Sequence, residues 1–571
     1  MRRTAYPRPE LRRTQWTNLC GRWEFDFDFG KSAKESGALF GKYKHRIEVP
    51  FCPESKLSGL EYKDFIPACM YRRKFSVKKA EGMRTLLNFE AVYFHTEVYI
   101  NEKQVGSHDG GYTPFSFDIT DAINDGENTV VVWCCGDPRN GREPSGKQCL
   151  NYYSKNCNYT RSTGIYQPVW LETVPERYLK SVKLDTYEDG SVYARLSLSG
   201  EGAAEVTMTA SLDGKRVASF KGTATKNDYI AVLNVKEPKL WSPDSPTLYD
   251  LKIEIRKGDS VDRVQSYFGI RTVSLDKYGM RINGKRVFQR LVLDQGYYPE
   301  SVYTAPDDGA FAEDIRLSMR MGFNGARLHE RVFERRFLYE ADKTGYLVWG
   351  EYPNWGFNVS APDAFDYYGE QWFEAVERDY NHPALIGWCP FNETWNYYGM
   401  KQNDKFVREI YILTKMYDKT RPVIDTSGNY HTETDIYDVH DYNQKPETFE
   451  ERYASFENGV FNNYVERQTY GGQPYMISEY GGIYWGDGKV GWGYGNNPKS
   501  EEEYVERFCG LTKAMLKNPR VCGFCYTQLY DIEQEQNGIY RYDRSPKFDD
   551  GKMDTMAAAV SAPAAFEEQE D

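Results

Sequence analysis

The sequence predicts a multidomain protein in which two β-sandwiches precede a C-terminal (β/α)8 barrel, the fold also called a TIM barrel. Its 571 residues are enough for about three or four domains. The first half consists of short alternating runs separated by turn residues, which is typical of antiparallel sandwiches. The second half alternates apolar strands with amphipathic helical segments, which is typical of a parallel sheet. We expect domains at residues 1–175, 176–272 and 273–571.

The composition excludes several classes of protein. Charged residues make up 27% and hydrophobic residues 40% of the chain, as in globular proteins. A formal net charge of −12 disfavours nucleic-acid binding, which needs a basic surface. No run approaches about 18 apolar residues, so we expect no membrane span. No apolar segment of a signal peptide follows the first arginines, so a cytoplasmic location is expected.

The two sandwiches differ in how regularly their residues alternate. In residues 20–175 the runs are short and broken by turns such as Asp109-Gly110-Gly111 and Asp125-Gly126. Residues 176–272 alternate more cleanly, and Asp213-Gly214 predicts a hairpin. Roughly seven short strands in about 95 residues predict an immunoglobulin-like sandwich for this second region.

The region after residue 273 contains eight strand candidates, which are Val287–Leu293, Gly322–Leu328, Tyr346–Glu351, Ala384–Phe391, Pro422–Thr426, Ile436–Tyr442, Pro474–Tyr480 and Val521–Leu529. Helical faces lie between most of them; Phe406, Ile410, Leu413 and Tyr417 share one face, and Phe311, Ile315 and Met319 share another. The fifth connection, Ser427–Asp435, has the composition of a loop. Eight strands in about 300 residues favour a barrel, and a doubly wound open sheet is the alternative.

Two glutamates follow apolar strands at corresponding places. The fourth strand candidate runs into Glu393, and the seventh reaches Glu479 just before its end. In a barrel, the carboxyl ends of the strands meet at one mouth, so these side chains can converge there. Paired carboxylates are what glycosidic bond cleavage requires, one as acid and the other as nucleophile or base. Tyr and Trp are concentrated around both, in residues 346–400 and 475–495, and aromatic rings suit the apolar face of a sugar.

Motifs distributed over nearly the whole chain identify a family resemblance. NHPALIGWCPFNET surrounds Glu393, MISEYGG surrounds Glu479, and further matching stretches are Leu86–Thr120, Gly164–Trp170, Leu240–Leu251 and Phe268-Gly269-Ile270-Arg271. Together they resemble glycoside hydrolase family 2, which includes β-galactosidases, β-glucuronidases and β-mannosidases. The resemblance implies that the first sandwich is a sugar-binding jelly roll, the second is immunoglobulin-like and the barrel is catalytic. The short chain resembles members that have only these three domains.

The resemblance also implies roles for residues around the glutamates. Glu393 corresponds to the acid/base and Glu479 to the nucleophile of a retaining mechanism. Asn392 corresponds to the residue that bonds the sugar 2-hydroxyl, with a turn residue as the alternative. Tyr442 looks like the tyrosine that bonds the nucleophile, and Arg327 like the arginine that supports it, although an ion pair within the barrel would also explain Arg327.

Other candidates have open alternatives. His440 shares a strand face with Tyr442, and a packed core histidine is the alternative. Asp294 is a candidate ligand for sugar hydroxyls, because the first strand departs from the histidine-rich segment of many members. His329 and Glu330 are either pocket residues or the start of a helix. Trp485 and Tyr526 either line the subsite or belong to the core.

The terminal sugar is predicted less sharply than the chemistry. β-Glucuronidases of the family carry Asn-x-Lys after the last barrel strand; Tyr526–Lys547 contains none, and Asn497-Pro498-Lys499 comes too early. We therefore place a β-galactoside first and keep glucuronide, arabinopyranoside, galactofuranoside and mannoside as alternatives. A transglycosylase would share the same chemistry. A non-catalytic carbohydrate-binding protein, the alternative from another class, would lack one of the glutamates.

Cofactors and partners follow from the same reasoning. Carboxylate chemistry requires no cofactor; some β-galactosidases use magnesium or sodium ions, but no residue set in this sequence matches those ligands, and the histidines show no zinc spacing. The expected partner is a carbohydrate or glycoside substrate, with no nucleic acid and no membrane. The resemblance is compatible with a homo-oligomer.

Overall fold

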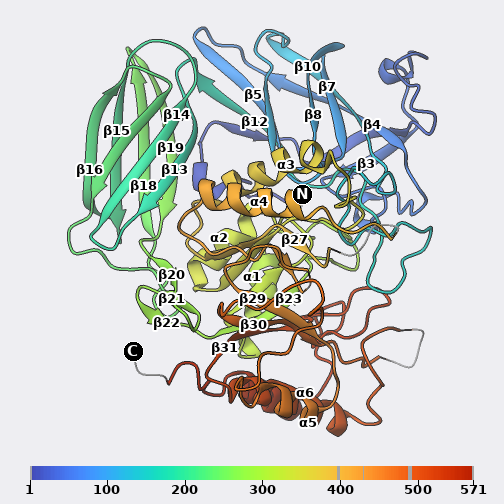
Figure 1. Cartoon of the computed structure of the whole chain (residues 1–571). Helices are drawn as coiled ribbons and strands as arrows, with labels where there is room; N and C mark the ends of the chain where they lie inside the picture. The colour runs from blue at the N-terminus through green and yellow to red at the C-terminus, as the bar shows by residue number, and fades with distance from the viewer. Residues whose placement is uncertain (1–2, 395–398, 429, 487–490, 569–571) are drawn as a thin grey trace.

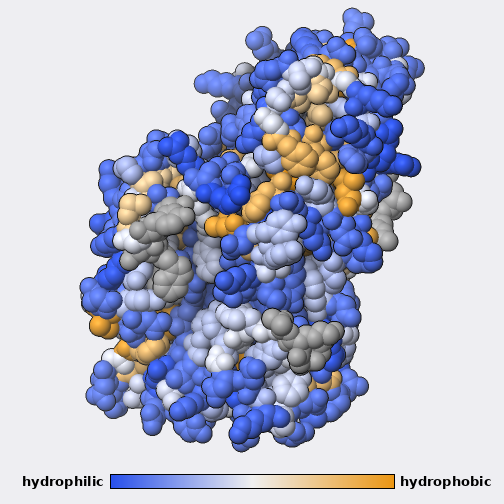
Figure 2. Space-filling view, turned by 90° about the vertical axis from the view of Figure 1, so that its right-hand side faces the viewer, coloured by the Kyte–Doolittle hydropathy of each residue, from blue (hydrophilic) through white to orange (hydrophobic). Residues whose placement is uncertain are grey.

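The computed structural model describes residues 3–568 except 395–398, 429 and 487–490. Figure 1 shows the two sandwiches side by side above the barrel, with the N-terminal one in blue and the second in green. The side of the molecule in Figure 2 is mainly hydrophilic, and its hydrophobic residues gather in a few patches. Among the described residues, none of the helices combines the length and apolar character needed to cross a bilayer.

The N-terminal domain is a sandwich of two antiparallel sheets around one core. One sheet has the order β1 (Trp16–Asn18), β12 (Val169–Pro175), β5 (Met83–Phe89), β9 (Phe115–Asp118). The other has the order β3 (His45–Val49), β2 (Gly21–Phe27), β4 (Ala68–Val77), β10 (Gly126–Cys135), β7 (His95–Ile100), β8 (Lys103–Asp109). Inward residues such as Trp23, Leu87 and Val132 form the core between them. A short pair, β6 (Val92–Tyr93) with β11 (Gly164–Ile165), and three 3-10 turns, η1 (Pro9–Leu11), η2 (Ala38–Phe40) and η3 (Lys56–Ser58), complete the region.

The second domain is a seven-stranded sandwich, as the alternation predicted. Three strands form one sheet in the order β13 (Leu179–Thr186), β14 (Ser191–Leu198), β17 (Asp228–Asn234). The other sheet has the order β16 (Lys215–Ala224), β15 (Ala204–Leu212), β18 (Tyr249–Lys257), β19 (Ser260–Phe268). Residues along β14 alternate between buried and accessible, so one face of each sheet packs on the shared core. A small sheet, β20 (Val273–Leu275), β21 (Met280–Ile282), β22 (Lys285–Arg286), leads into the barrel.

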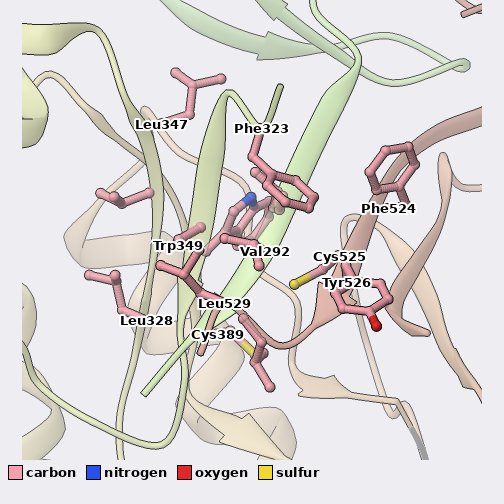
Figure 3. Packing of buried hydrophobic residues seen from close by; sticks show 14 of the residues in the cluster. Val292, Phe323, Leu328, Leu347, Trp349, Cys389, Phe524, Cys525, Tyr526 and Leu529 are labelled. Carbon is pink, nitrogen blue, oxygen red and sulfur yellow. The ribbon is translucent and has the colours of Figure 1, made fainter. Parts of the chain in front are cut away.

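The C-terminal domain is a TIM barrel of parallel strands. Seven strands pair in the order β26 (Leu385–Cys389), β25 (Leu347–Glu351), β24 (Gly325–Leu328), β23 (Gln289–Asp294), β31 (Val521–Thr527), β30 (Tyr475–Gly481), β29 (Tyr437–Asp441). These strands are almost entirely buried on both faces, which explains their continuous apolar runs. Figure 3 shows Val292, Leu328, Trp349 and Phe524, which belong to or directly follow these strands, among the packed core residues.

The fifth strand position is irregular. The predicted strand Pro422–Thr426 is reduced to β28 (Thr426–Ser427), which pairs in parallel with β27 (Phe391–Asn392), and to backbone bonds between its first residues and Trp388. The polar residues there use their backbone and side chains for local bonds: the Asp425 carboxylate accepts backbone N–H bonds from Thr432 and Glu433. The connection to β29 forms no helix among its described residues, in agreement with its loop-like composition.

Seven helices are described in the barrel: α1 (Ala310–Arg320), α2 (Arg335–Thr344), α3 (Ala364–Asp379), α4 (Asp404–Tyr417), α5 (Pro446–Tyr453), α6 (Glu501–Leu516) and α7 (Asp550–Val560). The predicted faces of α1 and α4 are largely correct, since Phe311, Ile315, Phe406 and Ile410 are buried. Met319 is the exception: it lies near the end of α1 and is 44% exposed.

The first residues of the chain connect all three domains. Arg3 forms ion pairs with Asp308 and Glu334 of the barrel. Arg13 forms ion pairs with Glu172 of the first sandwich and Asp262 of the second. The segment therefore fastens the two sandwiches to each other and to the barrel that carries the candidate site.

Candidate active site

The two predicted glutamates meet at the mouth of the barrel. Glu479 lies in β30, and Glu393 follows β27, where its backbone N–H donates to Ser427. One carboxylate oxygen of each lies within 4.8 Å of the other and of a ring nitrogen of His440. The barrel thus brings together the two carboxyl groups that the sequence placed on separate strands.

Glu479 is held by cationic and hydroxyl donors. Arg327 donates to its Oε1 over 3.1 Å, the Tyr442 hydroxyl donates to its Oε2, and Nε2 of His440 is 3.4 Å from Oε1. Burial raises the pKa of Glu479, but His440, His329, Arg327 and the Tyr442 bond outweigh it and lower the pKa to about 2. Glu479 is therefore an ionised carboxylate at neutral pH, which is the state that a nucleophilic carboxylate needs.

Arg327 links Glu479 to Asn392. Its guanidinium donates to Glu351 over 2.7 Å and to Oδ1 of Asn392 over 3.1 Å, in addition to Glu479. This bond fixes the amide of Asn392, whose Nδ2 is buried and has no partner among the described residues. Asn392 is thus positioned as a donor for a ligand.

Glu393 is paired with His440. Nδ1 of His440 lies 2.6 Å from Oε1 of Glu393, while Nε2 lies 3.1 Å from the Ser427 hydroxyl. Burial lowers the pKa of His440. The charges of Glu479 and Glu393 and the bond to Glu393 raise it by a larger amount, so the pKa of His440 lies above its ordinary value. Ser427 in turn donates to Asp438, which His431 also contacts, so the pair is backed by a buried polar chain.

His329 and Glu330 also lie at the mouth. Nδ1 of His329 is 3.2 Å from Glu351 and 3.9 Å from Glu479. Oε2 of Glu330 accepts backbone N–H bonds from Asn354 and Trp355, whereas its buried Oε1 has no partner among the described residues. Burial raises the pKa of Glu330 well above its ordinary value. Neither residue begins α2, which starts at Arg335, and both lie close to Glu351.

Three predicted site residues have other surroundings. Asp294 accepts bonds from the Tyr530 hydroxyl and the Gly296 N–H, and lies near Asp314 of α1 on the outer side of the sheet. Tyr526 bonds the hydroxyl of Tyr504 in α6, and Trp485 packs on Tyr504 and Phe548. The structure therefore places Asp294, Tyr526 and Trp485 in packing contacts away from the two glutamates. Figure 3 shows the hydroxyl of Tyr526 turned away from Val292 and Trp349.

Several residues at the barrel mouth were not predicted from the sequence. Glu351 ends β25, a place that the barrel rule alone could have indicated. The Tyr494 ring stacks on Tyr442 at a centroid distance of 3.4 Å, and it belongs to the aromatic region already noted. Glu535 accepts a bond from the Tyr159 hydroxyl of the N-terminal domain, and Lys147 of that domain lies over the Trp355 ring. No sequence signal indicated these last contacts between domains.

A cavity adjoins the acid/base candidate. It has a volume of about 570 Å³ and lies between the N-terminal domain and the barrel, where Gln148, Asn158, Trp355, Phe357 and Glu393 are among its lining residues. Glu393, His440 and Glu479 are the one set of metal-ligating side chains close enough for an ion among the described residues. The direct bond between His440 and Glu393 explains their proximity without an ion, so the expectation of no metal stays a prediction.

Comparison with known proteins places the chain in a family. Three family models match successive regions: the sugar binding domain of glycosyl hydrolases family 2 at residues 55–175, a further glycosyl hydrolases family 2 domain at 177–271, and the family's TIM barrel domain at 307–509. A β-galactosidase of Thermoanaerobacter pseudethanolicus is 26% identical over 63% of this chain and 48% of its own. A β-glucuronidase of Bacteroides fragilis is 28% identical over 70% of this chain and 60% of its own.

The fold is shared with solved structures as well. A β-glucuronidase from an uncultured Clostridium superposes with a TM-score of 0.78 at 21% identity, covering 98% of this chain and 99% of that one. The chain spans about half of the length of the curated relatives it matches, so the match concerns these three domains. With models for all three domains in their family order, the chain belongs to glycosyl hydrolase family 2.

Proposed function

We propose that the protein is a retaining exo-β-glycosidase that removes a terminal β-linked sugar. The observation that supports this most directly is the approach of Glu393 and Glu479, which have carboxylate oxygens within 4.8 Å of each other. Retaining enzymes hold their carboxyl groups about 5–5.5 Å apart, whereas inverting enzymes leave about 6.5–9.5 Å for a water molecule. The glutamates here are too close to admit that water.

The environments of the two glutamates fit different roles. Glu479, ionised and bound by Arg327 and Tyr442, attacks the anomeric carbon and forms a glycosyl ester. Glu393 gives a proton to the departing oxygen, and its contact with His440 provides a neighbouring group that shares that proton. In the second step Glu393 takes a proton from water, which attacks the same carbon and releases the sugar with its original configuration.

The identity of the sugar is the finer part of the proposal. The sequence favoured a β-galactoside, but relatives of both kinds, β-galactosidases and β-glucuronidases, match the chain to a similar degree. A neutral hexoside and a hexuronide differ by one carboxylate, so charge in the pocket discriminates between them.

Substitution of each glutamate tests the chemistry. We expect Glu479→Ala and Glu393→Ala to lower kcat on nitrophenyl β-glycosides by at least about 1,000-fold, because each removes a group that acts in the transition state. Azide should restore turnover in both variants, giving the α-glycosyl azide with Glu479→Ala and the β-glycosyl azide with Glu393→Ala. Glu457→Ala, at an exposed position, is the matched control and should keep full activity. Unchanged turnover in either active-site variant contradicts the proposal.

A further inference from the structure

Lys147 belongs to the N-terminal domain but reaches the barrel mouth on a fixed backbone. The N–H groups of Ser145 and Gly146 both donate to the carbonyl of Trp355 in the barrel, over 2.9 and 3.0 Å. The carbonyl of Lys147 accepts a bond of 2.7 Å from Tyr159. A side chain at Gly146 would come within 2.7 Å of the Glu330 carbonyl, so the approach of this segment depends on glycine. Lys147 is therefore held beside Glu330 from both sides.

The side chain of Lys147 is largely buried, but its ammonium nitrogen is not fully enclosed. Lys147 is only 6% exposed, and its Nζ forms no hydrogen bond or ion pair with any residue that the structure describes. Its Nζ lies 3.5 Å from the centroid of the Trp355 ring. A buried cation is rarely left unpaired, because loss of hydration is costly unless an anion or several acceptors replace the water.

The acidic groups that face Lys147 have other hydrogen-bond donors. Its electrostatic neighbours are Glu330, Glu535, Glu393 and Cys157, and its charge also reaches His329. Glu330 is bound by the N–H groups of Asn354 and Trp355, Glu535 by Tyr159 and Asn537, and Glu393 by His440.

Burial weakens the charge of two of these neighbours. It raises the pKa of Glu330 well above its ordinary value and that of Glu535 to about 7. Burial lowers the pKa of Lys147, but Cys157, Glu330, Glu535 and Glu393 outweigh burial and raise it, so Lys147 is a cation at neutral pH although none of the described residues bonds its Nζ.

Other cations near the site are already engaged. Arg327 is occupied by Glu351, Glu479 and Asn392. Lys547, in the stretch after the last barrel strand, is 2.7 Å from Asp531 and donates to two backbone carbonyls. Lys499 is exposed. Of the three lysines Lys147, Lys499 and Lys547, Lys147 is the one that is buried and has no hydrogen bond or ion pair on its Nζ among the described residues.

We propose that Lys147 binds the carboxylate of a terminal hexuronic acid, so that the N-terminal domain selects β-linked uronides for the barrel. This inference rests on the proposed glycosidase function and adds the substrate class to it. The unpaired Oε1 of Glu330 and Nδ2 of Asn392 are then available for hydroxyl groups of the same sugar. The absence of Asn-x-Lys after the last strand no longer argues against a uronide, because the charge comes from another domain.

The test compares three nitrophenyl substrates, the β-D-glucuronide, the β-D-galacturonide and the β-D-galactoside, with the full-length protein. The wild type should have a kcat/KM on at least one uronide that exceeds its value on the galactoside tenfold or more. Lys147→Met removes the charge and keeps the length of the side chain; it should lower kcat/KM on that uronide at least 100-fold and on the galactoside less than fivefold. Lys147→Arg should retain an intermediate preference for the uronide.

Each outcome decides between the two proposals. Preference of the wild type for the galactoside over both uronides, or an equal loss on all substrates in Lys147→Met, overturns the role of Lys147 and leaves the glycosidase function standing. An absence of turnover on all three substrates, with no glycosyl azide formed by Glu479→Ala, overturns both. Melting temperatures of both Lys147 variants within a few degrees of the wild type show that a loss of activity does not come from unfolding.

Discussion

His440 stands between the two glutamates proposed as catalytic, and its charge lowers the pKa of Glu479. Its two nitrogens lie 2.6 Å from Glu393 and 3.4 Å from Glu479. Without the imidazolium, two carboxylates within 4.8 Å of each other repel, which raises the pKa of one of them. The histidine is thus a positioning residue that acts through the glutamates.

We expect His440→Gln to lower kcat/KM by about 10- to 100-fold, within the range that general acid–base contributions span. Because the carboxylates lose a cation, the acid limb of the pH profile of kcat/KM should move to higher pH. The profile is measured with the best nitrophenyl substrate. His95→Gln, in a surface pair with Asp109, is the control and should leave the profile unchanged. A normal profile in His440→Gln would show that the contact has no role in ionisation.

At the residue scale, sequence reasoning was most successful where a motif and a strand end coincided. Asn392, Glu393 and Glu479 lie in such motifs, Arg327 and Tyr442 were assigned from strand ends and the family resemblance, and the structure brings all five together. The strand ends alone were less reliable, because a strand presents alternate residues to opposite faces. Asp294 lies four residues after Arg290 in β23, so both side chains point to the same face of the sheet. Arg290 bonds Glu567 on the outside of the barrel. Lys147 was not found, because only tertiary structure connects its loop to the barrel.

At the scale of elements, the end of β28 is shaped to receive the histidine. Gly428 has a φ of +84°, and a Cβ there would lie 2.4 Å from the His440 ring. Gly428→Ala should therefore displace His440 and lower kcat/KM at least tenfold, in addition to the roughly 1–2 kcal/mol that an alanine costs in left-handed backbone. Kinetics and denaturant unfolding measure the two effects.

Gly284 supplies the matched control. Its φ is +75°, but a Cβ there would meet nothing within 4 Å. Gly284→Ala should show a similar loss of stability and full activity. If Gly428→Ala also kept full activity, His440 would not need the space that the glycine leaves.

The elements themselves could be predicted to the extent that burial produced a pattern. Most of the seven paired barrel strands are apolar runs, although β29 contains Asp438, His440 and Asp441, and the strands of the second sandwich alternate. The fifth strand was predicted too long, since only Thr426 and Ser427 form a ladder, with Phe391 and Asn392, while the Asp425 carboxylate bonds the following loop and the Ser427 hydroxyl bonds Asp438. Its polar residues support the site, so composition was a poor guide to pairing there.

On the scale of the whole molecule, the candidate site depends on how the domains are joined. The barrel supplies the glutamates, while the N-terminal domain contributes Lys147, Tyr159 and one wall of the adjoining cavity. A small shift of that domain would change the pocket without altering the barrel. The ion pairs of the N-terminal segment are therefore part of what maintains the site.

The contribution of these ion pairs to holding the domains together can be tested by substituting Arg13. Only 4% exposed, it pairs with Glu172 over 2.7 Å and Asp262 over 2.9 Å, which belong to different sandwiches. Arg13→Met leaves both carboxylates buried with one cation fewer, which costs about 3–5 kcal/mol for a broken buried pair. We expect a lower melting temperature and faster proteolysis between the domains, with kcat/KM near normal at temperatures where the variant is folded.

Lys74→Met, which breaks an exposed pair with Glu127, should change stability by no more than about 1 kcal/mol. Equal stability of the two variants would mean that the sandwiches are held by their apolar contacts alone.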